Sequence, residues 1–199
     1  MPSIWPLLLL LAGEPSGAVI KVSLERNEDS RWTAVNPKLV LNHGDRIRLR
    51  FSSALAGNLY VWNVDSAGNS ERLLAQAVDG GQTYTIPTGD AWFTIDGPPG
   101  FDVVHFILTR NPLSESQQSQ TGDQLRATKP DTLVPRCRDS LLKARGVCSD
   151  DRAGAAAGAK LGDLKPRQLR IEQDGDETRI QPAGRAADPI VYLFRIAHQ

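Results

Sequence analysis

Three arginines alternate with apolar residues in the segment "GDRIRLRF" at positions 44 to 51. Because successive side chains of a β-strand point to opposite faces, this spacing predicts that Arg46, Arg48 and Arg50 share one face of a strand. Guanidinium groups bind phosphate, sulfate and carboxylate groups through paired hydrogen bonds, so the row is a candidate anion site. The alternative is a solvated face whose aliphatic stems cover apolar neighbours and whose ion pairs add little stability. We favour the solvated face and keep the anion site as the alternative.

Aromatic side chains are the second set that could contact a ligand. Trp32 lies in the polar segment "DSRWTAV" and is the tryptophan that we expect to be exposed, which makes it a candidate binding residue. Tyr60, Trp62 and Trp92 lie in apolar, strand-like segments, where a groove for carbohydrate or peptide is one interpretation. Core packing is the interpretation that we favour for these three side chains.

One turn gathers side chains that could bind calcium. The segment "NVDSAGNSE" carries four such residues, namely Asn63, Asp65, Asn69 and Glu71. An EF-hand loop would also need an oxygen ligand at the position of Ala67 and a glutamate at the position of Leu74. The pattern fails at both positions, so we expect a hairpin turn in which Asp65 and Gly68 serve the backbone geometry.

Histidine is the remaining residue type that commonly performs acid–base or metal chemistry. His43, His105 and His198 lie in a turn, an apolar strand and the chain end, and none has a second ligand at helical spacing. No motif places a serine or cysteine nucleophile beside His105, which we expect to be a core histidine. The sequence also contains no glycine-rich phosphate loop, kinase catalytic-loop pattern or nucleophile elbow. We therefore expect no enzyme activity, no metal site and no cofactor.

The two cysteines, Cys137 and Cys148, bracket a segment that suggests a short helix. In an exported chain we expect them to form a disulfide, whereas a cytosolic chain would keep two free thiols. Closing a loop of this size stabilises by about 3 kcal/mol in the chain-entropy model.

The first 18 residues, "MPSIWPLLLLLAGEPSGA", contain a leucine run that is too short for a membrane anchor and is followed by small residues. This pattern predicts a signal peptide cleaved after Ala18, and hence a periplasmic or secreted protein without a stable membrane anchor. A buried N-terminal strand or helix is the alternative. The 23 basic residues balance the 23 acidic ones, which argues against a dedicated nucleic-acid binder.

Short strands bounded by turns are expected to position these residues. Alternating or wholly apolar patterns mark strands in 18–26, 36–51, 57–64, 70–75, 82–87, 91–96 and 101–113. We predict one β-sandwich domain over 19–113, followed by a polar insert or linker with a short helix at 114–184. Residues 185–199 are again apolar and strand-like, so we expect them to pair back into the sandwich.

The order of several motifs resembles a known bacterial family. "GDRIRLRF", "GNLYVWNVDSAGN", "YTIP" and "FTIDGPPGFDVVHFILTRNP" follow one another, and a terminal strand ends near His198. Over about 19–113 and this strand, the chain resembles the family catalogued as domain of unknown function 4384. It departs from the family pattern in two places. Members carry "LFP" where this chain has "LLAQ" (73–76), and Asp102 stands near the position after "PG" where an acidic residue is expected. The matching positions are Gly44, Asp45, Ile47, Arg48 and Leu49, then Gly57, Leu59, Tyr60, Val61 and Gly68, then Pro99, Gly100, Thr109, Arg110 and Pro112.

The resemblance implies a β-rich extracytoplasmic domain with no established activity, which some relatives attach to kinase-like or peptidase-like domains. Together with the patterns above, we expect a mainly β, immunoglobulin-like antiparallel sandwich with a partly helical, disulfide-closed insert before the last strand. We expect a non-enzymatic module for protein interaction or envelope assembly, with another envelope protein as its partner. The alternative function is binding of an acidic glycan or phosphate through the arginine-lined face.

Overall fold

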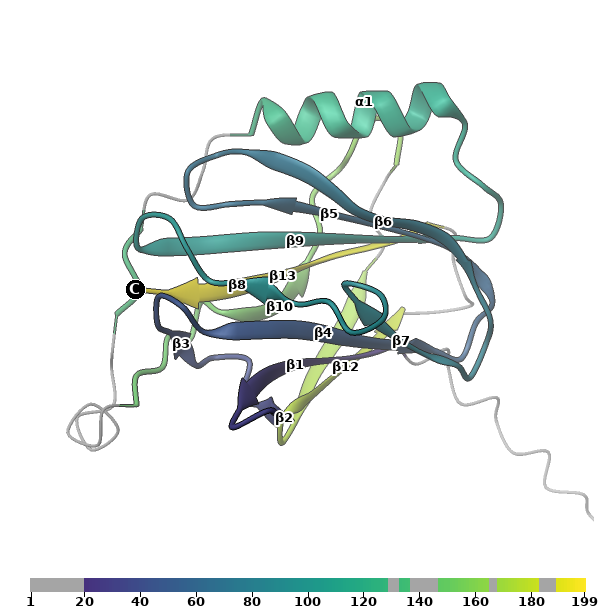
Figure 1. Cartoon of the computed structure of the whole chain (residues 1–199). Helices are drawn as coiled ribbons and strands as arrows, with labels where there is room; N and C mark the ends of the chain where they lie inside the picture. The colour runs from purple at the N-terminus through teal and green to yellow at the C-terminus, as the bar shows by residue number, and fades with distance from the viewer. Residues whose placement is uncertain (1–19, 129–132, 137–146, 165–167, 183–188) are drawn as a thin grey trace, which may run out of the picture.

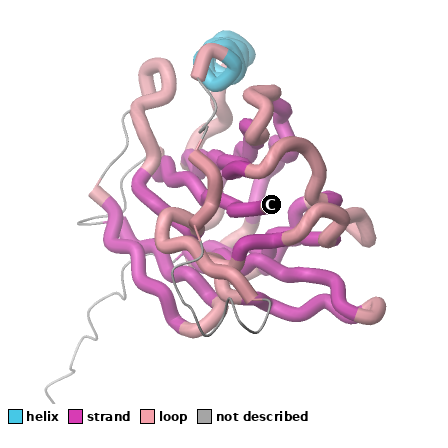
Figure 2. The backbone as a smooth tube through the Cα atoms, turned by 90° about the vertical axis from the view of Figure 1, so that its left-hand side faces the viewer, coloured by secondary structure: helices cyan, strands magenta, loops and turns pink. Residues whose placement is uncertain are grey.

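The computed structural model describes residues 20–128, 133–136, 147–164, 168–182 and 189–199. Within these ranges the chain forms two stacked β-sheets, and a helix lies over the outer face of one of them (Figure 1). A view turned by 90° shows the same arrangement, with the strands stacked below the helix (Figure 2). The predicted signal peptide (1–18) lies outside the described residues. Among the described residues, no helix is long and apolar enough to cross a membrane.

The seven-stranded sheet has the order β11-β12-β1-β4-β7, with β2 paired to β1 and β8 paired to β4. All of its pairings are antiparallel. Its strands are β1 (Ile20–Glu28), β2 (Arg31–Val35), β4 (Arg46–Ser53), β7 (Thr83–Ile86), β8 (Phe93–Thr94), β11 (Leu169–Asp174) and β12 (Glu177–Pro182).

The six-stranded sheet has the order β10-β13-β9-β5-β6, and β3 adds to β13 as a parallel neighbour. Its strands are β3 (Val40–Leu41), β5 (Gly57–Val64), β6 (Ser70–Val78), β9 (Gly100–Thr109), β10 (Gly154–Ala157) and β13 (Ile190–His198). The prediction of a mainly β, sandwich-like fold is confirmed. Its finer immunoglobulin-like type and the disulfide-closed insert stay predictions.

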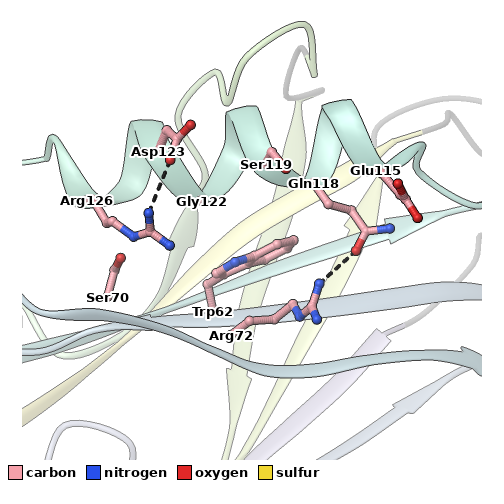
Figure 3. Close-up of a pocket in the computed structure, with 9 residues that line it drawn as sticks. All are labelled: Trp62, Ser70, Arg72, Glu115, Gln118, Ser119, Gly122, Asp123 and Arg126. Atoms are coloured by element: carbon pink, nitrogen blue, oxygen red, sulfur yellow. Dashed lines mark hydrogen bonds and ion pairs between the residues drawn. The ribbon is translucent and has the colours of Figure 1, made fainter.

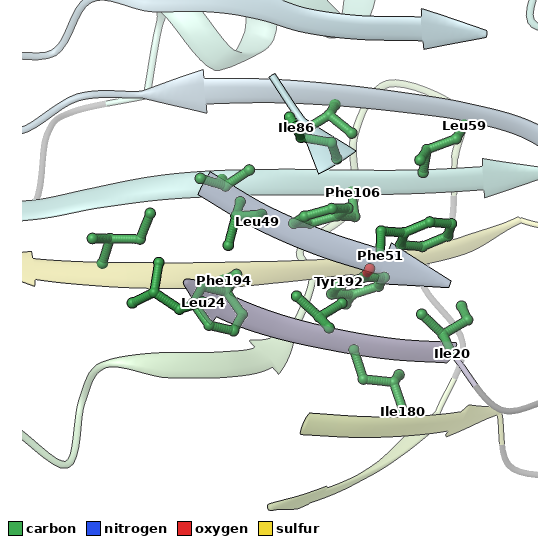
Figure 4. Close-up of a cluster of buried hydrophobic side chains, with 14 of the residues drawn as sticks. Ile20, Leu24, Leu49, Phe51, Leu59, Ile86, Phe106, Ile180, Tyr192 and Phe194 are labelled. Atoms are coloured by element: carbon green, nitrogen blue, oxygen red, sulfur yellow. The ribbon is translucent and has the colours of Figure 1, made fainter. Parts of the chain in front are cut away.

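The main core lies between the two sheets and follows from the alternation of apolar residues along the strands. On β4 the inward residues Ile47, Leu49 and Phe51 are buried, as their spacing predicts. Aromatic rings join the sheets at the centre (Figure 4), where Phe106 of β9 stacks on Phe51 at 6.1 Å and on Tyr192 of β13 at 4.7 Å between ring centroids. Aromatic stacking of this kind adds to the stabilisation from burial.

The central strands of the six-stranded sheet, β5, β9 and β13, are largely buried on both faces. The outer face of this sheet carries a second apolar cluster, in which Tyr60 and Trp62 of β5 pack with Val191 of β13 and Leu125 of the helix α1 (Glu115–Arg126). Figure 1 shows α1 lying across this face above β5 and β6. The helix explains why β5 is apolar on both sides, a pattern that the sequence indicates for a central strand.

The helix α1 is not predicted by the sequence, because its residues are almost all polar. A capping box starts it: the Ser114 hydroxyl accepts from the Gln117 backbone N–H, and the Gln117 side chain accepts from the Ser114 N–H. Only Thr121 and Leu125, one turn apart, are buried, which is too narrow a stripe to reveal an amphipathic helix. The short helix that we predict between the two cysteines falls in 137–146, outside the described residues.

Much of the region predicted as an insert joins the two sheets. The alanine-rich segment forms β10, which pairs with β13, and β11 and β12 form a hairpin that pairs with β1. The sequence does not predict β10, because the segment is of low complexity and alanine has little intrinsic preference for strands. The terminal strand β13 pairs as expected and lies inside its sheet, between β10 and β9.

Candidate functional site

The three arginines project from the outer face of β4, opposite the core, as predicted. Arg48 faces Glu25 directly across the β1–β4 pair, and its Nε lies 2.5 Å from a Glu25 carboxylate oxygen. Arg50 contacts the other oxygen through Nη1 at 3.4 Å. Glu25 is only 5% exposed, although it lies on the outer face. Two guanidinium groups therefore share one buried carboxylate.

Two tryptophans flank this row. The Arg48 guanidinium carbon lies 4.4 Å from the ring centroid of Trp32, and that of Arg46 lies 4.9 Å from the ring centroid of Trp92. A cation placed over an aromatic ring in this way is attracted by the ring's negative face. We call this set, Arg46, Arg48, Arg50, Trp32, Trp92 and Glu25, the Arg–Trp surface.

The structure corrects one aromatic prediction. Trp92, which we expected in the core, is 45% exposed. Its segment forms only the two-residue strand β8, and Trp92 precedes that strand on the side of the arginines. Tyr60 and Trp62 are buried, which confirms core packing for both. The predicted binding residue Trp32 is half-buried because it lies against Arg48.

Sequence reasoning missed Glu25. Its local segment reads as an ordinary alternating strand in which Glu25 is an outward polar residue. Only the register between β1 and β4 places it opposite Arg48. Knowledge of that strand pairing would have been enough to find it, because opposite charges favour directly facing positions on neighbouring strands.

The turn after β5 is a hairpin turn, as predicted. Both Asp65 carboxylate oxygens accept hydrogen bonds from Asn69, one from its backbone N–H at 2.7 Å and one from its side chain at 2.8 Å. Gly68 adopts φ +91°, a conformation that favours glycine. Among the described residues no group of three or more potential ligands could hold a metal ion.

The three histidines lie in different environments. His43 is exposed in its turn, and His198 is buried with Nε2 3.2 Å from a carboxylate oxygen of Asp102. His105 lies on β9 under α1 and is 7% exposed. Burial, together with the nearby Arg195 charge, lowers the pKa of His105 from 6.5 to about 4. His105 is thus a neutral imidazole at pH 7.

A polar groove of about 700 Å³ lies between α1 and β6 (Figure 3). Its floor is Trp62, which is only 4% exposed and offers little ring surface to a ligand. Arg72 donates to the Gln118 side chain at 2.9 Å, and Arg126 pairs with Asp123 at 3.2 Å. Both arginines of the groove are engaged by neighbours, so it is a weaker candidate than the Arg–Trp surface.

Only one cysteine of the predicted disulfide, Cys148, lies within the described residues. Cys148 is buried beside Val40 and Phe101 and does not carry a free thiol. Cys137 lies outside the described residues, so the pairing of the two cysteines stays a prediction.

Residues 40–112 match the family described as domain of unknown function (DUF4384). The predicted resemblance is confirmed. The matched segment starts later than the 19–113 range that the motifs suggested, and it ends at almost the same residue. No curated protein and no solved structure matches the chain significantly.

The DUF4384 motif residues mainly support the fold. Gly57 must be glycine, because a Cβ there would lie 2.5 Å from the Thr109 carbonyl oxygen. The Tyr60 hydroxyl accepts the backbone N–H of Leu113 at 2.8 Å and so holds the chain where it leaves β9. Asp45 accepts the backbone N–H of Asn42 at 2.8 Å in the turn before β4. Arg48 is the DUF4384 motif residue that also belongs to the Arg–Trp surface.

Proposed function

We propose that this protein is a non-enzymatic interaction module whose Arg–Trp surface binds an acidic surface of another protein. One observation supports this most directly: the exposed Trp92 stacks on Arg46 beside the Trp32–Arg48 pair, on a single sheet face. Tryptophan and arginine are the residues most enriched among those that dominate binding energy in protein interfaces. The proposal therefore rests on the kind of residues exposed and on their arrangement.

The surface is also ordered before binding. The Arg48 guanidinium is held between the Trp32 ring and the Glu25 carboxylate, so it loses little rotamer freedom when a partner binds. Such preorganisation favours affinity. Arg48 and Arg50 share the single carboxylate of Glu25, so together with Arg46 the surface carries a surplus of positive charge. A partner with exposed carboxylates would complement that charge.

Binding of an acidic glycan or phosphate is the alternative for the same surface. The surplus positive charge on Arg46 and Arg50 favours it. The engagement of Arg48 by Glu25 counts against it, since a guanidinium that is already paired has fewer donors left for a second anion. We therefore rank protein binding first.

We also propose that the protein works in the bacterial envelope, with a Cys137–Cys148 disulfide and an immunoglobulin-like topology. The leucine-rich leader and the even number of cysteines support this location. Sequencing the N-terminus of the fractionated protein should give a start near Val19. Recovery of intact Met1 from the cytoplasm, or of two labelled thiols per chain, would contradict the proposal.

Site-specific photo-crosslinking tests protein binding. A photoreactive residue at Thr94, which faces Arg46 across the β4–β8 pair, should give a discrete adduct with one partner in the native host. The same residue at the exposed Ala77 on β6 is the control and should not give that adduct. The double variant Arg46→Gln, Trp92→Ala should lose the adduct, whereas Arg170→Gln, on β11, should keep it.

The glycan alternative predicts a different result. Sulfate or an acidic glycan should then raise the melting temperature of the purified protein, less so at high salt, and the triple variant Arg46→Gln, Arg48→Gln, Arg50→Gln should lose this gain. That result without a Thr94 adduct would reverse our ranking.

A further inference from the structure

A cavity of about 380 Å³ lies on the outer face of the six-stranded sheet, beneath the C-terminal end of α1. Its walls come from β5, β9 and β13, from the end of α1, and from the segment 159–161 that follows β10. The volume is within the range of small-molecule sites. The cavity lies on the six-stranded sheet, whereas the Arg–Trp surface lies on the seven-stranded sheet. A site in this cavity is therefore independent of the proposed function. Its apolar lining is Val64, Phe101, Val103, Leu125, Leu161 and Leu193.

Two polar side chains of this cavity each have one buried nitrogen without a hydrogen-bond partner among the described residues. His105 is more than nine-tenths buried, and its Nδ1 has no hydrogen-bond partner among the described residues. The Nε of Arg195, which also lines the cavity, is buried and equally without a partner there. Buried polar atoms are normally satisfied, so each exception requires an explanation. A ligand that hydrogen-bonds to both groups would supply one.

The charges around the cavity favour a single negative charge on that ligand. Arg195 and Lys160 provide two positive charges, and neither has an ion-pair partner within the described part of the chain. Asp65 provides one negative charge, but both of its carboxylate oxygens already accept hydrogen bonds from Asn69. His105, with a pKa lowered to about 4, adds no charge at pH 7. The net charge around the cavity is therefore one positive charge, which a ligand with a single negative charge would neutralise.

The segment that closes the cavity is tied to α1. Gln124 donates from its side-chain amide to the Lys160 carbonyl at 3.0 Å and accepts the backbone N–H of Gly162. Leu125 and Leu161 pack in the same apolar cluster. These contacts hold the apolar side chains of Leu125 and Leu161 at the cavity, so its lining combines apolar side chains with the polar groups of His105 and Arg195.

We propose that this cavity binds a small carboxylate with an apolar body, the carboxylate lying at Arg195 and His105 and the body against Leu125 and Leu161. Arginine matches the geometry of a carboxylate. A phosphate monoester carries between one and a half and two negative charges near neutral pH, more than the cavity balances. An uncharged apolar molecule would leave Arg195 unpaired. An amphipathic monoanion is therefore the ligand class that suits both the polar and the apolar residues of the lining.

Thermal denaturation and calorimetry of the full chain test the proposal with three probes, namely naphthoate, phenylacetate and octanoate. At least one probe should raise the melting temperature in proportion to the logarithm of its concentration. The matched neutral amide of that probe should bind about tenfold more weakly or worse, because it lacks the charge-assisted hydrogen bonds. Failure of all three carboxylates at millimolar concentration, or equal binding of acid and amide, would overturn the proposal.

Variants locate the binding. Arg195→Gln should weaken it about tenfold or more, and Ala159→Phe, at an exposed position of the cavity rim, should abolish it by filling the space. Arg170→Gln and Ala157→Phe are exposed controls outside the cavity and should change the affinity less than twofold. The His105 imidazole signals in NMR spectra should shift on binding. Unchanged affinity in Ala159→Phe, or unshifted His105 signals with bound ligand, would place the ligand elsewhere and contradict the proposal.

Discussion

At the scale of single residues, Arg48 and Arg50 differ although both contact Glu25. The Arg48 side chain is 18% exposed and that of Arg50 is 52% exposed. Ion pairs in contact with water contribute little, whereas removing one partner of a buried pair leaves an uncompensated charge. The equal spacing of the two arginines in the sequence therefore hides unequal contributions to stability.

We predict that Arg48→Gln lowers the free energy of unfolding by about 2 kcal/mol, because Glu25 stays buried without a full charge partner. Arg50→Gln should cost only about 0.3 kcal/mol. Urea unfolding near pH 7 measures both values. Equal effects of the two substitutions would show that the Glu25 carboxylate does not depend on Arg48.

His105 should make stability depend on pH. Its pKa is lowered to about 4 in the folded protein, while the unfolded chain keeps the ordinary value of 6.5. Between these values the unfolded state binds the additional proton, so the contribution is complete above pH 6.5 and is lost as the pH falls toward 4. The slope is about 1.4 kcal/mol per pH unit, and the total is about 3 kcal/mol. Urea unfolding across this interval measures it.

The control for this prediction is His105→Gln, which cannot titrate and should show a shallower slope over the same interval. Asp150 and Glu177 also have lowered pKa values, Asp150 chiefly through hydrogen bonds from Arg152, and Glu177 through Lys21 and Arg179 acting against its partial burial. Their contributions are lost at more acidic pH, because a carboxylate with a lowered pKa destabilises the fold only as it becomes protonated. Identical slopes for the wild type and the variant would refute the role of His105.

At the scale of elements, α1 is a polar helix held by few contacts, and Gly122 lies in its middle. A Cβ at Gly122 would have Trp62 Nε1 as its nearest neighbour at 3.9 Å, which is ordinary contact. We predict that Gly122→Ala stabilises the protein by about 0.5–1 kcal/mol, because glycine is entropically costly inside a helix. Thermal denaturation with tryptophan fluorescence measures the effect.

Two further substitutions control for this helix prediction. Ser114→Ala removes the hydroxyl of the capping box and should cost about 1 kcal/mol. Gly57→Ala should destabilise, since its Cβ would lie too close to the Thr109 carbonyl. A Gly122→Ala variant that is less stable than the wild type would show that the added methyl group does not fit between α1 and Trp62.

At the scale of the whole molecule, the DUF4384 segment is not a complete sandwich. Residues 40–112 contain β4, β5 and β9 but lack β1 and β13, which lie inside the two sheets. The ring stack between Phe106 and Tyr192 would be lost with β13. The strands outside the matched segment are thus as necessary to the core as those within it.

We predict that a fragment of residues 40–112 does not fold alone, because it exposes the core faces that β1 and β13 cover. Its NMR amide spectrum should be poorly dispersed, and its denaturation should show no cooperative transition. The fragment 20–199 is the control and should behave like the full chain. Cooperative unfolding of the shorter fragment would show that the matched segment is an independent domain.

The sequence by itself determined the features that depend on neighbouring residues. The period of two on β4 separates Arg46, Arg48 and Arg50 from the core, and Asp65 with Gly68 identifies the hairpin turn, because strand faces and turn geometry are local properties. The family motifs were equally readable, and the match over 40–112 agrees with them.

Only the tertiary structure decided which residues and elements lie opposite one another. Glu25 lies opposite Arg48 through strand register, and Trp92 contacts Arg46 because it directly precedes β8, which pairs with the start of β4. Neither α1 nor β10 has a strong local pattern, and both form because a sheet already offers them a surface or an edge. The cavity at His105 exists only where β9, β13 and α1 meet. Such contacts join residues that are far apart in the chain. No short segment of the sequence therefore includes both partners of the interactions that stabilise them.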